Sequence, residues 1–206
     1  MSVRQGTERV LSMNASVLRP EEKEYLLRWT RRVIENAVSG GDSMRIPDSD
    51  LGEGLRSPYG AFVTIKKHGE LRGCIGRMDF DRPLWENATY AAVGAALHDP
   101  RFPPLDREEL PAIRLEISVM DVPQDLPQPD QFDPQRHGII VEQGCRRALL
   151  LPKVAQEYGW TAKKTLECVC QKAGLAPDAW AGPEARLQVF TTCDFAEPDA
   201  RPGAGG

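Results

Sequence analysis

Residues 62–76 read Phe-Val-Thr-Ile-Lys-Lys-His-Gly-Glu-Leu-Arg-Gly-Cys-Ile-Gly, and this stretch decides the fold of the region around it. Its first four residues are β-prone, His68-Gly69 is a turn signal, and apolar residues then recur at even spacing. This pattern predicts a β-hairpin whose second strand contains the hexapeptide 71–76.

The hexapeptide Leu71-Arg72-Gly73-Cys74-Ile75-Gly76 is also the strongest indication of a functional site. Strand alternation predicts that Arg72 and Cys74 share a face, where a guanidinium favours the reactive thiolate form of a cysteine. Glycines at 73 and 76 would let a ligand or another backbone approach closely. The alternative is a buried cysteine in a strand whose glycines mark a bulge.

The rest of the chain alternates between helical and β patterns. Amphipathic or small-residue helices are predicted at 20–38, 83–97 and 161–173, a strand at 113–120, a second hairpin at 139–151 and a last β-prone run at 186–192. Asp106 to Glu109 form a capping box for a short helix, and the Gly-, Pro- and Ser-rich stretch 42–57 is predicted to be a loop. Hairpins separated by helices indicate an α+β fold with an antiparallel sheet and packed helices.

Composition places the chain in the ordinary globular class. It has 206 residues, 41% of them hydrophobic and 27% charged, with a net charge of −4. Because basic residues are not gathered in a stripe, we expect no nucleic-acid partner. Residues 1–10 lack the apolar core of a signal peptide and no long apolar run occurs, so we expect a cytoplasmic protein with no membrane partner.

The cysteines and histidines do not form a metal or disulfide pattern. Five cysteines are an odd number, none of them forms a Cys-x-x-Cys pair, and the three histidines are scattered. We therefore expect reduced thiols, no metal and no cofactor.

Several blocks occur in an order that resembles the AMMECR domain family, whose prokaryotic members are called AmmeMemoRadiSam system protein A. Besides the hexapeptide, the blocks lie at 99–105 (Asp-Pro-Arg-Phe-Pro-Pro-Leu), 116–119, 136–139, 149–152, 159–160 and 170–175, with Trp180. The resemblance implies a domain of two unequal lobes, the larger built from both chain ends around an antiparallel sheet. It predicts a single domain at 15–195, which leaves an N-terminal extension at 1–14. The tail at 196–206 is expected to be disordered, because the residues after Glu197 are rich in Pro, Ala and Gly and have few apolar anchors.

The resemblance implies no established reaction. The prokaryotic family name reflects genomic association with a Memo-like protein and a radical S-adenosylmethionine protein, so these are expected as partners beside an unknown small molecule or protein. The family signature has been proposed as a functional site, and in this chain it falls on residues 71–76. Arg77 stands where relatives often have a small residue.

One hypothesis is a thiol-dependent enzyme or acceptor. In it Cys74 is the nucleophile or the modified atom, Arg72 activates it or binds an anion, and His137 is the base. Asp99 would orient His137. The alternatives are a His137 that bonds to backbone at a strand entry and an Asp99 that forms an Asp-Pro turn.

The other hypothesis is a non-catalytic module that binds a peptide, a protein or a small anion. Arg72, Arg101, Glu116 and Ser118 would line its polar pocket, with Arg101 held ready by its proline-rich loop. Arg101 in a salt bridge between loop and sheet, and Glu116 on a solvated strand face, are the alternatives. The sequence leaves open which hypothesis holds.

Overall fold

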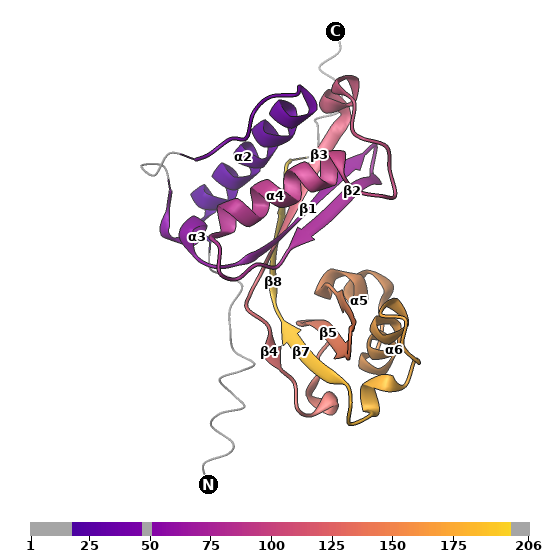
Figure 1. Cartoon of the computed structure of the whole chain (residues 1–206). Helices are drawn as coiled ribbons and strands as arrows, with labels where there is room; N and C mark the ends of the chain where they lie inside the picture. The colour runs from indigo at the N-terminus through magenta and orange to yellow at the C-terminus, as the bar shows by residue number, and fades with distance from the viewer. Residues whose placement is uncertain (1–17, 47–50, 199–206) are drawn as a thin grey trace. The chain divides into compact units, whose positions relative to one another are not determined.

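The structure is a computed structural model that describes residues 18–46 and 51–198. The chain divides into two compact units. Among the described residues, the larger unit holds the stretch up to Met120 together with 193–198, and the smaller unit holds 121–192. Each unit has its own sheet and its own core (Figure 1).

The larger unit contains a four-stranded sheet in the order β2-β1-β3-β8. Its strands are β1 (Gly60–Lys67), β2 (Glu70–Arg77), β3 (Ile113–Met120) and β8 (Thr192–Ala196). The β1–β2 turn is formed by His68 and Gly69, whose φ angles of 53° and 87° are the positive values that a two-residue hairpin turn requires. The predicted hairpin and the strand at 113–120 are confirmed.

Helices cover one face of this sheet. They are α2 (Pro20–Val38), the short α3 (Glu53–Arg56) and α4 (Leu84–Leu97), with α2 and α4 side by side in Figure 1. Alternate strand residues such as Val63 and Ile117 point toward them and are fully buried, as are Leu26 and Ala91 on the helices. The alanines of α4 let its backbone approach the sheet closely, and this contact positions β2.

The smaller unit pairs a second four-stranded sheet, in the order β4-β7-β5-β6, with two helices. Its elements are β4 (Gln124–Asp125), β5 (Gly138–Gln143), β6 (Arg146–Leu150), α5 (Pro152–Tyr158), α6 (Ala162–Lys172) and β7 (Arg186–Phe190). Ile139, Val141, Leu166 and Cys170 lie in its core. The predicted N-cap of the third long helix is confirmed, because the Thr161 side chain accepts a hydrogen bond from the Lys164 N–H.

Single-turn 3₁₀ helices occur at η3 (Pro129–Gln131) and η4 (Ala179–Ala181), and a longer one at η2 (Arg107–Ala112). The capping box predicted at Asp106 starts η2, with the Asp106 carboxylate accepting from the Glu108 N–H. Among the helices within 18–46 and 51–198, none has both the length and the apolar character that crossing a membrane requires.

The expectations for the stretch 42–57 and for the tail need correction. The stretch 42–57 contains α3, because Leu55 is almost fully buried and anchors a helical turn. The tail does not begin at 196. Ala196 ends β8, and Glu197 binds Arg31 and the backbone N–H of Leu115. The ordered chain therefore continues through this ion pair. The predicted extension at 1–14 and the residues from 199 onward lie outside the described residues.

Candidate functional site at the edge of strand β2

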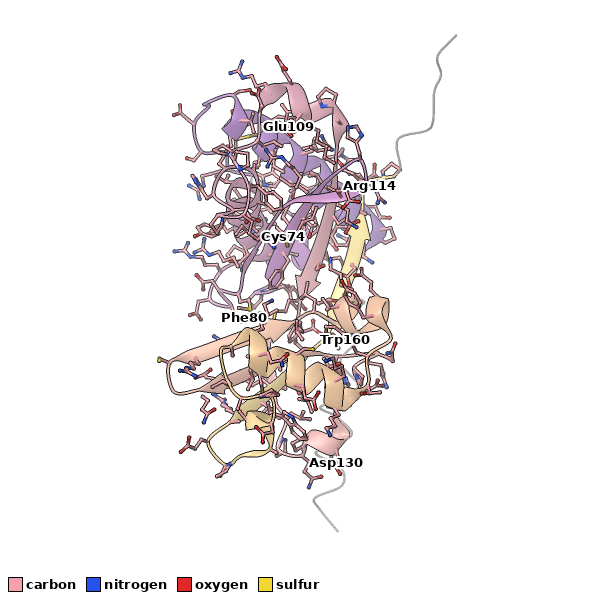
Figure 2. The ribbon with its side chains drawn as sticks, turned by 90° about the vertical axis from the view of Figure 1, so that its right-hand side faces the viewer. Cys74, Phe80, Glu109, Arg114, Asp130 and Trp160 are labelled. Carbon is pink, nitrogen blue, oxygen red and sulfur yellow. The ribbon has the colours of Figure 1, made fainter. Side chains whose placement is uncertain are left out.

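Strand β2 is an edge of its sheet, and two side chains of the loop after α4 complete it. The backbone N–H of Cys74 donates to Asp99 Oδ2 at 2.8 Å, and Arg101 Nη2 donates to the Cys74 carbonyl oxygen at 3.1 Å. A carboxylate and a guanidinium thus take the place of a neighbouring strand, which protects the edge from pairing with another chain. Cys74 is labelled on this strand in Figure 2.

Asp99 is the buried anchor of this arrangement, with 4% of its surface exposed. It binds Arg101 in a two-pronged ion pair, through Nε at 2.9 Å and Nη2 at 2.7 Å. The hydrogen bonds from Arg101, followed by the backbone N–H of Cys74, hold the pKa of Asp99 well below its usual range. Asp99 is therefore ionised, and its charge is matched by Arg101.

Arg101 is fixed at one edge and open at the other. Its side chain is 53% exposed, and no residue in 18–46 or 51–198 accepts a hydrogen bond from Nη1. The hydrogen bonds to Asp99 raise the pKa of Arg101, and the Cys74 thiol raises it further. The bond from Nη2 to the Cys74 carbonyl oxygen brings the guanidinium to the backbone of Cys74. The ring of Phe102 lies 5.5 Å from the Arg101 guanidinium carbon and supports it from the loop.

The Cys74 side chain is half-buried on the sheet face opposite to the helices. Thr64 on β1 is the cross-strand neighbour of Cys74, and its hydroxyl donates to the Cys74 sulfur at 3.3 Å. Because the Cys74 N–H and C=O point outward to Asp99 and Arg101, this is a non-hydrogen-bonded pair, in which facing side chains come close. The sequence analysis did not single out Thr64; the strand register is the signal that finds it.

Sheet register places four of the predicted site residues on this face: Cys74, Gly76, Glu116 and Ser118. One row runs from Cys74 through Thr64 to Glu116, and the next row is Gly76, Phe62 and Ser118. Glu116 is held in ion pairs with Lys66 at 2.7 Å and with Arg114 at 3.5 Å. Ser118 donates its hydroxyl to Asp194 on β8.

Arg72 is engaged elsewhere. A one-residue register shift between Ile65 and Lys66 leaves Arg72 as the unpaired residue of β2, so the regular alternation assumed from the sequence is interrupted there. The Arg72 guanidinium binds both oxygens of Glu109, at 3.0 and 2.9 Å, and the carbonyls of Pro103 and Pro104. The hydrogen bonds from Arg72, followed by the one from Lys67, lower the pKa of Glu109 to about 2. Arg72 therefore ties β2 to η2 and to the proline-rich loop.

The two glycines of the signature serve packing. A Cβ on Gly73 would lie 2.2 Å from the carbonyl oxygen of Ala95 in α4, so the glycine admits the helix backbone. A Cβ on Gly76 would lie 2.1 Å from the ring of Phe62, which crosses the glycine from the neighbouring strand. The expectation that Gly76 leaves its face open to a ligand is therefore wrong, because the Phe62 ring fills that space.

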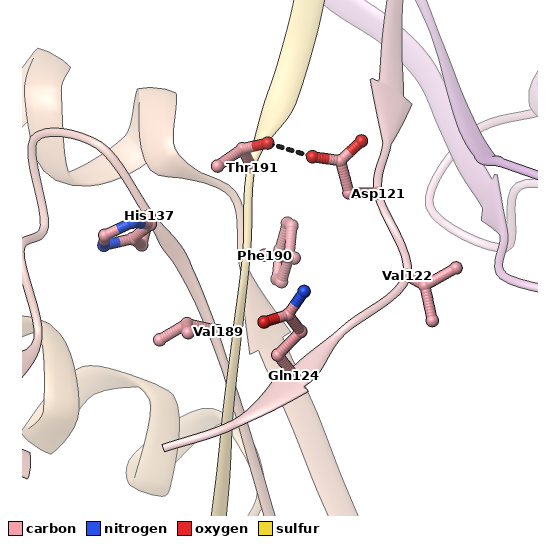
Figure 3. A pocket seen from close by; sticks show the side chains of 7 residues that line it. All are labelled: Asp121, Val122, Gln124, His137, Val189, Phe190 and Thr191. Atoms are coloured by element: carbon pink, nitrogen blue, oxygen red, sulfur yellow. Dashed lines mark hydrogen bonds between the residues drawn. The ribbon is translucent and has the colours of Figure 1, made fainter. Parts of the chain in front are cut away.

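His137 belongs to the smaller unit and is 5% exposed. Burial lowers its pKa, so the imidazole is neutral at neutral pH, and its Nδ1 has no hydrogen-bond partner. It lines a cavity of about 20 Å³ together with Asp121, Gln124 and Thr191 (Figure 3). Asp121 accepts from the Thr191 hydroxyl, and its pKa is raised by burial. That His137 acts on Cys74 stays a prediction, since the two residues lie in separate units.

The described stretches 18–46 and 51–198 contain no group of three or more His, Cys, Asp or Glu side chains that could hold a metal ion. The chemistry available at the edge of β2 is that of a thiol beside a fixed cation.

Comparison with known proteins identifies the fold family. The model of the AMMECR1 family matches residues 27–195. The chain belongs to the AMMECR1 family. A protein of Methanothermobacter thermautotrophicus is 41% identical over 191 residues, which cover 90% of this chain and 99% of that protein. A protein of Aquifex aeolicus is 38% identical over 173 residues, covering 81% and 88%.

A solved structure supports the same assignment. The crystal structure of an uncharacterized protein from Pyrococcus horikoshii matches with a TM-score of 0.83 and 36% sequence identity, covering 88% of this chain and 94% of that one. The family resemblance and the α+β fold predicted from the sequence are thereby confirmed. None of these AMMECR1 relatives carries a named reaction.

Proposed function

We propose that this AMMECR1-family protein acts through a thiol site in which the Cys74 sulfur reacts or is modified and Arg101 holds an anionic group of the incoming molecule. One observation carries the proposal: the Arg101 guanidinium donates to the backbone carbonyl of Cys74, is locked by buried Asp99 and keeps Nη1 without a protein acceptor among the described residues. A guanidinium edge fixed in this way is preorganised for a carboxylate or phosphate.

The proposal changes the roles of the charged residues named from the sequence. Unlike Arg101, Arg72 uses Nε, Nη1 and Nη2 on Glu109 and on two loop carbonyls, so it keeps no nitrogen for a ligand. Glu116 is held between two cations and is not proposed to bind the ligand. Arg101 takes the anion-binding role, and Asp99 positions Arg101. Gly73 and Gly76 shape the strand that carries Cys74.

That His137 removes the thiol proton stays a prediction from the sequence, because His137 and Cys74 lie in different units. A Memo-like protein and a radical S-adenosylmethionine protein are proposed as partners on the strength of the family resemblance alone.

The test compares two alkylating reagents that differ in charge. Iodoacetate and iodoacetamide both form a carbon–sulfur bond and release iodide, but only iodoacetate is an anion. A unit charge about 4 Å away contributes on the order of 1 kcal/mol even at the dielectric constant of bulk water, so Arg101→Gln should lower the iodoacetate to iodoacetamide rate ratio at Cys74 about fivefold or more. Exposed Cys145 is the internal reference, followed by mass mapping of each thiol.

Controls separate charge from unfolding. Arg101→Lys keeps the charge and should retain most of the ratio, and Arg82→Gln removes an exposed arginine of the same unit and should leave it unchanged. Each variant is used at a temperature where its circular dichroism shows a folded protein. A folded Arg101→Gln protein with the wild-type ratio would overturn the proposed role of Arg101. A Cys74 that neither reagent labels in the native protein would overturn the thiol site.

A non-catalytic anion-binding module remains the second candidate, and the open Nη1 of Arg101 favours it as well. It is distinguished by Cys74→Ser. Unchanged binding of phosphate or of a carboxylate probe by this variant, with loss in Arg101→Gln, would support the module and oppose a reacting thiol.

A further inference from the structure

The larger unit also contains a hollow whose lining residues do not include Cys74. It has a volume of about 390 Å³ and is lined by the segment after α2, the end of β2 and the first turns of α4. This volume falls within the range of sites for small molecules.

An exposed aromatic ring is held in a fixed position in this hollow. Tyr90 of α4 is 57% exposed, and the guanidinium carbon of Arg77 lies 4.5 Å from the centre of its ring. Arg77 is in turn held by Asp79 at 3.2 Å. The cation therefore fixes the ring while leaving much of it in solvent. Trp85, which is 8% exposed, adds an apolar wall to the same hollow.

Among the polar groups that line the hollow, one cation has no ion-pair partner in the described part of the chain. Glu86 is paired with Arg82 at 2.8 Å, and Asp79 with both Arg77 and Arg82. Thr89 accepts from the Trp29 indole and donates to the Trp85 carbonyl, so its hydroxyl is used. Arg45 lines the hollow, is exposed, and has no ion-pair partner within 18–46 and 51–198.

We infer that this hollow binds a small aromatic carboxylate. The ring of the ligand lies against Tyr90 and Trp85, and its carboxylate pairs with Arg45. Apolar and aromatic walls supply contact area, while a single cation orients the ligand, which is the usual division of work in small-molecule sites. This site is independent of the thiol site at Cys74.

The test is an NMR titration of the full-length protein with 4-hydroxybenzoate. We expect saturable shifts of the backbone amides of Arg45, Thr89 and Tyr90. The uncharged 4-hydroxybenzamide, which keeps the ring, and cyclohexanecarboxylate, which keeps the charge, should each bind at least about fivefold more weakly, the factor expected for loss of one surface charge contact or of one aromatic contact.

Substitutions test whether the ligand binds in this hollow. Tyr90→Ala and Arg45→Gln change exposed side chains and should each weaken binding of 4-hydroxybenzoate about fivefold or more. Tyr158→Ala and Arg32→Gln, which remove an exposed tyrosine and an exposed arginine elsewhere, should not. Arg101→Gln should also leave binding intact, which separates this inference from the thiol site. Absence of saturable shifts would overturn the inference. So would Tyr90→Ala and Arg45→Gln proteins that bind 4-hydroxybenzoate as tightly as the wild type does.

Discussion

The carboxylate of Asp99 accepts a hydrogen bond from the backbone N–H of Cys74 at 2.8 Å, across 25 residues of sequence. Arg101 closes the arrangement by donating to the Cys74 carbonyl. The Asp-Pro-Arg block at the start of the proline-rich loop and the cysteine signature are therefore one structural unit. Each holds the other in place, and the thiol is presented from a strand whose edge cannot move freely.

Replacing Asp99 with asparagine tests this unit. The amide keeps one acceptor for the Cys74 N–H but loses the charge that binds Arg101, so we expect a loss of about 2 kcal/mol in the free energy of unfolding. The Cys74 amide should also exchange its hydrogen faster. Urea unfolding and hydrogen exchange measure the two effects, with exposed Asp81→Asn as the control. An Asp99→Asn protein with wild-type exchange at Cys74 would show that the edge does not depend on the carboxylate.

Gly73→Ala should disturb the packing of α4 on the sheet. The added Cβ meets the Ala95 carbonyl oxygen at 2.2 Å, and a helix backbone moves only as a whole, so we expect a cost of about 3 kcal/mol. Gly182→Ala, whose nearest neighbouring atom would lie 3.3 Å from the new Cβ, should cost far less. Thermal and urea unfolding compare the two variants. Similar stabilities would mean that α4 shifts at little cost.

Gly76 and Phe62 should behave as a coupled pair. Gly76→Ala forces the Phe62 ring aside, whereas in a Phe62→Leu background the smaller side chain leaves room for the new methyl group. We expect Gly76→Ala to cost about 1 to 2 kcal/mol alone and clearly less in the Phe62→Leu background. A double-mutant cycle on the free energy of unfolding measures the coupling. Additive effects would contradict the contact.

The stabilising contribution of ionised Glu109 should be lost in acid. Its pKa is lowered from 4.5 to about 2 in the folded protein, chiefly by Arg72. A group with a depressed folded pKa stabilises the fold above its unfolded pKa, and this contribution is lost as pH falls from 4.5 toward 2. The contribution is about 3 kcal/mol at most for a side chain that is 17% exposed.

The measurement compares Glu109→Gln with the wild type in urea at a series of pH values. The glutamine variant should be less stable at pH 7, and the difference should shrink progressively below pH 4.5. Exposed Glu108→Gln provides the control. A difference that stays constant down to pH 3 would show that the Arg72–Glu109 pair does not contribute through its charge.

The thiols should react in a defined order. Cys170 has no exposed surface, and burial raises its pKa, whereas Cys74 is half-buried beside Arg101. A limiting amount of iodoacetamide at neutral pH should therefore label Cys74 well before Cys170 in the folded protein. Mass mapping over time gives the order, and unfolded protein, in which both thiols are accessible, serves as the reference. Preferential labelling of Cys170 would reverse the assignment.

Much of the fold was predictable because it rests on local patterns. The alternation of Ile113 to Met120 and the helical stripe of 20–38 are periodic over many residues, and the structure contains both elements with these bounds. The missed elements are short. Glu53–Arg56 spans a single turn, and Gln124–Asp125 becomes a strand only by pairing with β7. Such segments carry too few residues for a period to be recognised.

The candidate site was only partly predictable. The sequence located Cys74 and Arg101, but it assigned the wrong neighbour to the thiol. A hairpin with a two-residue turn at His68-Gly69 and regular pairing would set Thr64 opposite Gly73. The register shift beside Ile65 moves Cys74 to that place and turns Arg72 toward Glu109. A bulge of this kind follows from contacts of β2 with the proline-rich loop, and these contacts leave no periodic signal.

By itself, the sequence determined the kinds of elements, their order and the presence of a cysteine between glycines in a β-hairpin, because propensity and periodicity act over neighbouring residues. Tertiary structure alone decided which side chains meet: Arg101 and Asp99 at the edge of β2, Arg72 with Glu109, and the Phe62 ring over Gly76. Arg72 and Glu109 are 37 residues apart in the chain, and the Arg101–Asp99 pair is placed beside Cys74 only by the packing of loop against strand. The physical reason is that long-range partners are selected by the free energy of the whole packed unit.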